Sequence, residues 1–144
     1  MIKVERSALV KHSAEKMYQL VDSVENYPDF LPWCGGSRVI RRTANETVGE
    51  IVIARAGFHK TFSTQNHNVP HGRIELKLRD GPFSHLEGVW SFNALREDAC
   101  KISLDMEFEF SSKLANIAFS KIFEHICSTM IESFCKRADE VYGR

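Results

Sequence analysis

Residues that could carry catalytic or metal chemistry are present in this chain, but their spacing matches no familiar pattern. The sequence contains six histidines and four cysteines. A zinc site usually takes two ligands from one short motif, H-E-x-x-H or C-x-x-C, so that both reach one ion. Neither motif occurs, and we therefore expect no metal site, no catalytic residue and no catalytic cofactor. The histidines are His12, His59, His67, His71, His85 and His125, and the cysteines are Cys34, Cys100, Cys127 and Cys135.

Cys34 is the cysteine with the most unusual surroundings, because it ends the aromatic segment YPDFLPWC (residues 27–34). A nucleophilic thiol needs a base that takes its proton and a group that orients the base. No such base lies nearby in the sequence. Four cysteines are also few for a disulfide scaffold of this length, so we expect free and mostly buried thiols.

Lys60 and Arg55 are the cations most favourably placed to serve an interior site. Lys60 shares the strand parity of Phe58 and Phe62, and residues of one parity face the same side of a sheet. Its ammonium would then reach the mouth of a cavity, with its stem along apolar surface. The alternative is that both side chains are ordinary surface charges and that a bulge turns Lys60 outward.

Two groups of basic residues lie on predicted strands and would suit contacts with RNA phosphates. The chain as a whole has 19 basic and 19 acidic residues, so no global charge steers it to DNA or to an anionic membrane. A basic outer face is equally typical of a solvated strand, and Glu75 interrupts the second group. The groups are Arg38, Arg41 and Arg42, and Arg73, Lys77 and Arg79.

The elements that must position these residues follow from periodicity. Residues 1–11 alternate apolar and polar side chains as a half-buried strand does. Ser13 is a good N-cap for an amphipathic helix of about three turns that stops near Asn26. Prolines at 28 and 32 then limit residues 27–34 to a short helical turn and a loop, which Gly35 and Gly36 end.

Residues 37–110 show almost no helical periodicity and have a turn signal about every ten residues, which predicts an antiparallel meander. After residue 110 the spacing changes to three and four. Ser111 and Ser112 are cap candidates for one long amphipathic helix of roughly 30 residues, about 45 Å. No apolar run reaches the roughly 18 residues that a membrane span needs.

We expect one domain, residues 1–144, with an α+β fold in which a curved antiparallel sheet wraps around the long C-terminal helix. Such a grip leaves room for an apolar cavity, although aromatics at this spacing also suit an ordinary core. The aromatic loop, with Phe30, Leu31 and Trp33, would close the cavity as a lid or simply bury its own rings. The expected cavity residues are Phe62, Trp90, Phe92, Phe108, Ile126, Met130 and Phe134.

Three segments resemble one family across nearly the whole chain. They are YPDFLPWC (27–34), DGPF (80–83) with Leu86, Gly88, Trp90 and Phe92 after it, and FCKRA (134–138). Together they resemble the coenzyme Q-binding START-like proteins and their bacterial relatives, the ribosome association toxin (RatA) family, within the polyketide cyclase-like SRPBCC superfamily. The resemblance implies the START-like helix-grip fold, a deep hydrophobic cavity and no metal.

The same resemblance implies a non-enzymatic protein that binds ubiquinone or a related isoprenoid lipid and supports respiration as a quinone carrier or chaperone. From its strand parity, and not from the resemblance, Lys60 would donate a hydrogen bond to a quinone oxygen or a lipid headgroup near the cavity mouth. The alternative is a toxin that binds the large (50S) ribosomal subunit through the two basic groups and blocks subunit association. A third is a cyclase- or dehydratase-like enzyme with Lys60 or Arg55 as acid or base. We expect a cytoplasmic protein, with transient contact at the inner membrane left open.

Overall fold

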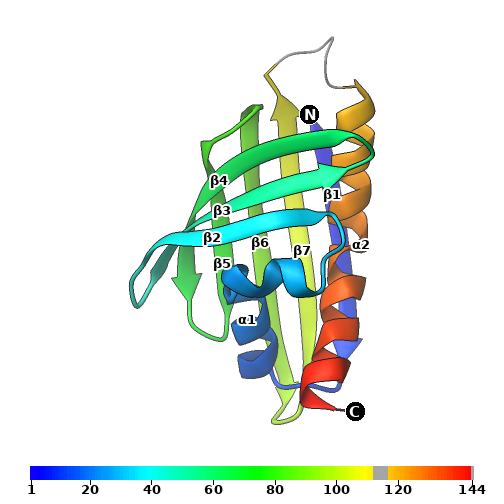
Figure 1. The fold of residues 1–144 in the computed structure, drawn as a ribbon. Helices are drawn as coiled ribbons and strands as arrows, with labels where there is room; N and C mark the ends of the chain where they lie inside the picture. Colours follow the sequence, from blue (N-terminus) through cyan, green and yellow to red (C-terminus); the bar gives the residue numbers. More distant parts are fainter. Residues whose placement is uncertain (112–116, 144) are drawn as a thin grey trace.

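The computed structural model describes residues 1–111 and 117–143, which form one seven-stranded sheet and the helices packed on it (Figure 1). All neighbouring strands are antiparallel, in the order β1-β7-β6-β5-β4-β3-β2. The predicted meander is confirmed. The strands are β1 (Ile2–Val10), β2 (Cys34–Arg42), β3 (Glu46–Arg55), β4 (Phe58–Val69), β5 (Arg73–Asp80), β6 (Phe83–Arg96) and β7 (Ala99–Phe110), and the helices are α1 (Ala14–Asp22), η1 (Val24–Asp29) and α2 (Ile117–Tyr142).

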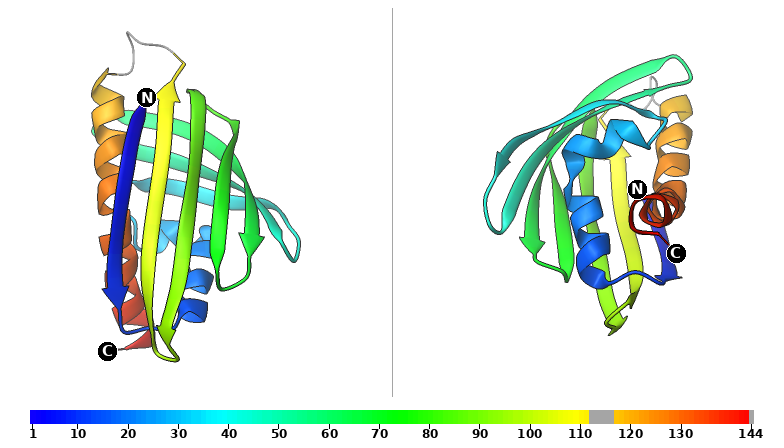
Figure 2. Two further views of the ribbon diagram at one scale, coloured as in Figure 1. Left: turned by 180° about the vertical axis from the view of Figure 1, so that it is seen from behind. Right: turned by 60° about the horizontal axis from the view of Figure 1, so that its bottom comes forward.

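The sheet is strongly curved, and its concave side faces α1, η1 and α2 (Figures 1 and 2). Register shifts interrupt the pairing of β2 with β3, β4 with β5, and β6 with β7, and an extra residue on one strand bends the pair and increases its twist. Gly81 permits one close approach: its φ is +152°, and a Cβ there would lie 2.6 Å from the Cβ of Phe62. Curvature is what makes an enclosed interior possible.

The N-terminal helix is shorter than the sequence suggests. Ser13 caps α1 as predicted, since its Oγ accepts from the Lys16 backbone N at 3.1 Å. The α-helix ends at Asp22 and not near Asn26, because the backbone of Ser23 leaves the helical region, with ψ at 63°. The Ser23 N–H still donates to the Gln19 carbonyl as in a helix, and the Ser23 hydroxyl donates to the same oxygen. A separate 3₁₀ turn, η1, follows and contains Pro28.

The predicted long C-terminal helix is α2, whose 26 described residues correspond to about 39 Å. It lies along the concave side beside β1 (Figure 2), and His12 joins it to the β1–α1 turn by bonding to Asp139 at 2.8 Å. Ser111 does not cap this helix; its hydroxyl donates to the Pro82 carbonyl instead. The other cap candidate, Ser112, lies outside the described residues.

Candidate functional site

An apolar cavity of about 70 Å³ lies between the concave face of the sheet and α2. Residues of η1, of strands β3 to β7 and of α2 line it, together with Trp33 from the aromatic loop. Of the seven residues expected to line a cavity, Phe62, Trp90, Ile126 and Met130 do so.

The other three expected cavity residues belong to the packed core around it. Phe92 stacks on Trp90 and meets Tyr18 edge-on, Phe108 contacts Phe123 at 4.7 Å between ring centroids, and Phe134 packs on Trp90 at 5.3 Å. Periodicity assigns all seven the same parity or helix face. The four lining residues and the three core residues differ in how far along their strand or helix they lie from the cavity, and the sequence alone does not give that distance.

The cavity is small because phenylalanine rings fill one end of the interior. Phe123 of α2 is 3% exposed and contacts the rings of five other phenylalanines from β4, β6, β7 and α2. A cavity of about 150 Å³ holds benzene, so a ring-sized ligand needs some rearrangement here. Met106 and Met130 line the space, and their flexible side chains can move to provide it.

Polar residues that were not expected from the sequence line the same cavity. Thr64 and Asn66 of β4 are buried, 7% and 5% exposed, and both face the cavity. Neither side chain forms a hydrogen bond with another described residue, and Asn66 Oδ1 is a buried acceptor without a partner. The sequence did contain a signal for them, because polar residues occupy alternate, inward-facing positions along β4. Asn68, at the next such position, is also buried.

Asn68 differs from Asn66 in having structural partners. Its Nδ2 donates to Asp22 Oδ1 at 2.9 Å and to Thr47 Oγ1 at 3.1 Å, and the Thr47 hydroxyl also donates to Asp22. This network fastens the end of α1 to β3 and β4. The polar stripe on β4 therefore divides into a structural part at Asn68 and an unpartnered part at Asn66 and Thr64.

Lys60 and Arg55 are exposed and do not line the cavity. The expected bulge at Lys60 does not occur, since β3 and β4 pair in unbroken register with Lys60 opposite Ile53. Lys60 thus has the inward parity of Phe62 but lies near the β3–β4 turn, beyond the buried part of the strand. On β4, the polar side chains that can contact a ligand inside this cavity are therefore those of Asn66 and Thr64, and not that of Lys60.

The aromatic loop is buried against the end of the sheet. Trp33 lines the cavity, and Leu31 is 1% exposed. Phe30 is half-buried, with its ring against Phe134 and the Arg137 guanidinium 5.2 Å above it. Of the three proposed lid residues, Trp33 alone borders the cavity.

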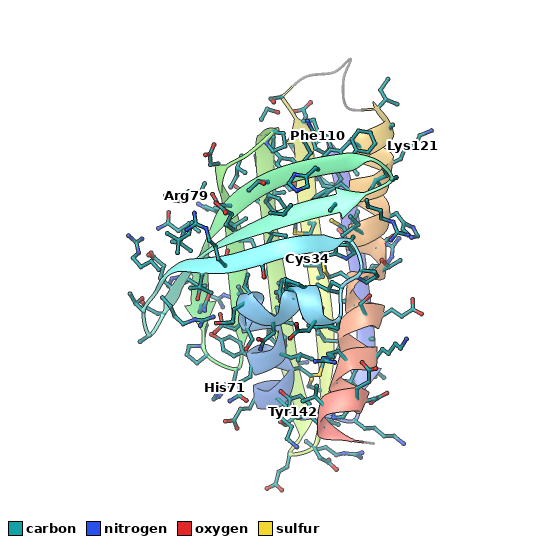
Figure 3. All side chains as sticks on the ribbon, viewed as in Figure 1. Cys34, His71, Arg79, Phe110, Lys121 and Tyr142 are labelled. Atoms are coloured by element: carbon teal, nitrogen blue, oxygen red, sulfur yellow. The ribbon has the colours of Figure 1, made fainter. Side chains whose placement is uncertain are left out.

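Most of the basic side chains named for RNA contact are paired with nearby carboxylates. Among them, Arg38 bonds to Glu50, Arg41 to Glu46 and Arg42 to Glu25, at 2.9, 2.5 and 2.7 Å between the nearest atoms. Arg73 lies 3.5 Å from Glu75. Lys77 forms no ion pair with another described residue. Arg79, labelled in Figure 3, belongs to the central strand β5 and, among the described residues, donates a hydrogen bond to the Ser63 hydroxyl alone.

A larger, open groove of about 650 Å³ runs between β1 and α2 on the outside of the molecule. Its lining mixes charged side chains such as Arg6 and Glu132 with apolar ones such as Leu9 and Ile131. The interior cavity is the better candidate for a small apolar ligand, because enclosure removes more of the ligand's surface from water.

One group of possible metal ligands is present although no sequence motif marks it. Single ligand atoms of His85, Glu87 and Glu107 lie within 4.8 Å of one another on the paired strands β6 and β7. His85 Nε2 is 3.1 Å from Glu107 Oε1, so an ordinary ion pair accounts for the arrangement. Cross-strand pairing brings these residues together, which spacing along the chain cannot show.

The cysteines lack the features of a nucleophile. They are free thiols, as predicted, and Cys34, Cys100 and Cys127 are buried. Burial raises the pKa of Cys34, and Cys34 Sγ has the Gly36 carbonyl at 3.3 Å as its hydrogen-bond partner. Burial also raises the pKa of Cys127 to about 12 and that of Cys135 to about 11.

Because a thiolate is the reactive form, we expect Cys127 to react with a disulfide reagent at pH 8 at least about tenfold more slowly in the folded protein than in urea. Burial raises the pKa of this thiol to about 12 and so lowers its thiolate fraction at pH 8, which outweighs the higher nucleophilicity of a thiolate with a raised pKa. Mass spectrometry of the modified peptides would measure the rates, and equal rates in both states would contradict a buried thiol.

Comparisons with known proteins agree on one kind of fold. The family described as "Polyketide cyclase / dehydrase and lipid transport" matches residues 10–135. The ribosome association toxin RatA of Vibrio cholerae is 48% identical over 99% of this chain and 99% of its own. A mitochondrial coenzyme Q-binding protein, COQ10 homolog B of Xenopus laevis, is 31% identical over 99% of this chain and 60% of its own.

A solved structure with the same fold is the Zhui aromatase/cyclase from Streptomyces sp. R1128. It has a TM-score of 0.84 at 16% identity and covers 96% of this chain and 93% of its own, which supports the fold alone. Within the part of the chain that the structure describes, no helix combines the length and apolar character of a membrane span.

Proposed function

We propose that this chain, which belongs to the polyketide cyclase / dehydrase and lipid transport family, binds a hydrophobic small molecule in the cavity under α2 and acts as its carrier or chaperone. Its membership confirms the resemblance drawn from three sequence segments, and the helix-grip fold is likewise confirmed. The ligand we favour is ubiquinone or a related isoprenoid lipid, since one relative is named as a coenzyme Q-binding protein.

The observation that carries this proposal is an apolar cavity with unpartnered polar groups in its wall. Removing apolar surface from water contributes about 25 cal/mol per Å², so an isoprenoid tail supplies affinity with few polar contacts. If this region served only as a hydrophobic core, filling the space and pairing Asn66 would both stabilise the protein.

Tryptophan fluorescence tests the proposal, because the chain has two tryptophans and both line the cavity. Titration with decylubiquinone, whose ring quenches indole emission on contact, is expected to give saturable quenching at one equivalent. Quenching that rises linearly without saturation, as for free tryptophan in the same buffer, would contradict a binding site.

The lining also argues against an enzyme. Tyr27 and Cys127 are the titratable side chains in the described lining. The Tyr27 hydroxyl donates to the Val21 carbonyl at 2.5 Å, and burial raises its pKa, so neither group is a ready acid or base near neutral pH. We therefore propose a non-enzymatic role, which the names of the sequence relatives also favour.

A second function, association with the ribosome in the cytoplasm, is favoured by the toxin relative at 48% identity over nearly the full chain. Lys77 and Arg79 are the basic side chains of the two groups that form no direct ion pair with a described carboxylate. Contact through the outer face of β5 leaves the cavity on the concave face free, so the two functions are compatible.

Sedimentation with purified large ribosomal subunits tests this second function. Co-sedimentation should fall steeply with salt, and a double Lys77→Ser and Arg79→Ser variant should lower the logarithmic salt slope by about 1 for each phosphate that is no longer neutralised. Lys101→Ser, an exposed lysine on β7, is the matched control. Equal slopes for all three proteins would remove the outer face of β5 from the interface.

A further inference from the structure

The described residues of the cavity wall carry no charge. They are aliphatic, aromatic, sulfur-containing, amide or hydroxyl side chains together with Gly49. A carboxylate or phosphate head inside would therefore be buried without a counter-ion among the described lining residues, which is strongly unfavourable in a protein interior. Lys60 and Arg55, the two cations that sequence analysis proposed for an interior site, are exposed.

The wall is nevertheless not purely apolar, because Asn66 places an amide there. Its Oδ1 is buried without a partner, and its Nδ2 donates to no other described residue. Buried polar groups in native proteins nearly always have a hydrogen-bond partner, and exceptions call for an explanation. The neighbouring Asn68 differs, because only its Oδ1 lacks a partner while its Nδ2 donates two hydrogen bonds. Asn66, whose Oδ1 and Nδ2 both lack a described partner, is the one that lines the cavity.

Other hydrogen-bonding groups of the wall are also unused. The Thr64 hydroxyl and the indole N–H groups of Trp33 and Trp90 have no partner among the described residues. Thr64 lies two residues from Asn66 on the same face of β4, about 6.7 Å away along the strand. A polar head that lies along β4 therefore passes both side chains.

We propose that Asn66, supported by Thr64, is the polar anchor of the cavity and that the ligand carries a neutral hydroxyl-bearing head, such as a phenol, an alcohol or the quinol form of a quinone. For a ubiquinone-type ligand, we therefore expect the reduced quinol to be held more tightly than the oxidised quinone, which has no hydroxyl to donate. A hydroxyl both donates to Oδ1 and accepts from Nδ2 or from Thr64, which a bare hydrocarbon and an anion do not. This inference rests on the proposed ligand-binding function and adds the chemical class of the head and the residue that recognises it.

Calorimetric titration with 4-propylphenol, propylbenzene and 4-propylbenzoate tests the inference, because the three share one skeleton and differ in the head. We expect the phenol to bind about tenfold more tightly than propylbenzene and the benzoate to bind most weakly. Asn66→Leu should abolish the tenfold preference while leaving the affinity for propylbenzene within about twofold, and Thr64→Val should reduce the preference in part.

Two controls accompany these variants. Gln65→Leu changes an exposed side chain on the opposite face of β4 and should keep the full preference. Asn66→Leu without ligand should melt about 3 °C higher than the wild type, since it replaces an unpaired buried amide by an apolar group of similar size. If Asn66→Leu melts at a higher temperature and also loses the preference for the phenol, the loss is due to ligand recognition and not to misfolding.

The outcomes are distinct. A preference for the phenol that survives in Asn66→Leu overturns the role of Asn66 but leaves ligand binding intact, and tightest binding of the benzoate overturns the neutral head. If the wild type binds none of the three probes, the proposed function fails and this inference fails with it.

Discussion

Replacing Phe123 by alanine is expected to lower the free energy of unfolding by about 3–5 kcal/mol. The ring is 3% exposed and lies in edge-on or tilted contact with Phe62, Phe83, Phe108 and Phe119, among others. Its removal deletes the packing that joins α2 to the middle of the sheet and leaves a hole that rigid neighbouring rings cannot fill. Urea unfolding followed by circular dichroism would give the value.

Phe123→Leu is the matched control, with a smaller destabilisation because most of the volume stays. A destabilisation below about 1 kcal/mol for Phe123→Ala would mean that the phenylalanine cluster collapses into the space. Since Phe123 also borders the cavity, the alanine variant should gain affinity for propylbenzene and recover part of its melting temperature when that compound is added.

Replacing Met130 by tryptophan is expected to abolish binding of decylubiquinone. Met130 is a half-buried residue of α2 in the cavity wall, and an indole at this position fills a space of about 70 Å³. Because the side chain is only half-buried, we expect overpacking to cost no more than about 1–3 kcal/mol. Ultrafiltration followed by chromatography of the retained quinone measures binding without relying on tryptophan emission.

Glu124→Trp is the control for this variant, because it adds the same ring on an exposed position of α2 that does not line the cavity. It should bind decylubiquinone as the wild type does. Undiminished binding by Met130→Trp, with folding intact, would place the quinone elsewhere on the protein.

The fold could be predicted because its determinants are local. Strict alternation in residues 101–110 and a three- and four-residue repeat in the C-terminal helix each record which face is buried, and turn residues mark the hairpins. The family resemblance then supplied the way in which sheet and helix combine. The early end of α1 was not predictable, since it depends on the non-helical backbone of Ser23, whose ψ is 63° and whose hydroxyl bonds back to the Gln19 carbonyl.

The site was only partly predictable because it depends on distances between elements. Parity correctly identified Phe62 and Trp90 as inward residues but could not say that Phe92 and Phe108 lie beyond the cavity. Lys60 has inward parity yet is exposed, because it lies close to the β3–β4 turn. The ion pairs of Arg38 and Arg41 join β2 to β3, so the register of two strands had to be known before they could be found.

Asn66 shows a different limit of sequence reading. A polar residue at an inward position was visible, but whether it is paired, as Asn68 is with Asp22, or bare could only be learned from the folded chain. This difference is why we assign ligand recognition to Asn66. An unpaired buried amide costs about 1–3 kcal/mol of stability, and a ligand that pairs with it offsets this cost.

The most direct test of the central claim is organic extraction and mass spectrometry of the wild type and of Met130→Trp, each purified gently from the protein's own organism beside an empty-column control. We predict close to one equivalent of a neutral isoprenoid lipid with an oxygenated head in the wild type and none in the variant. No lipid in the wild type, or the same amount in both proteins, would contradict a ligand held under α2.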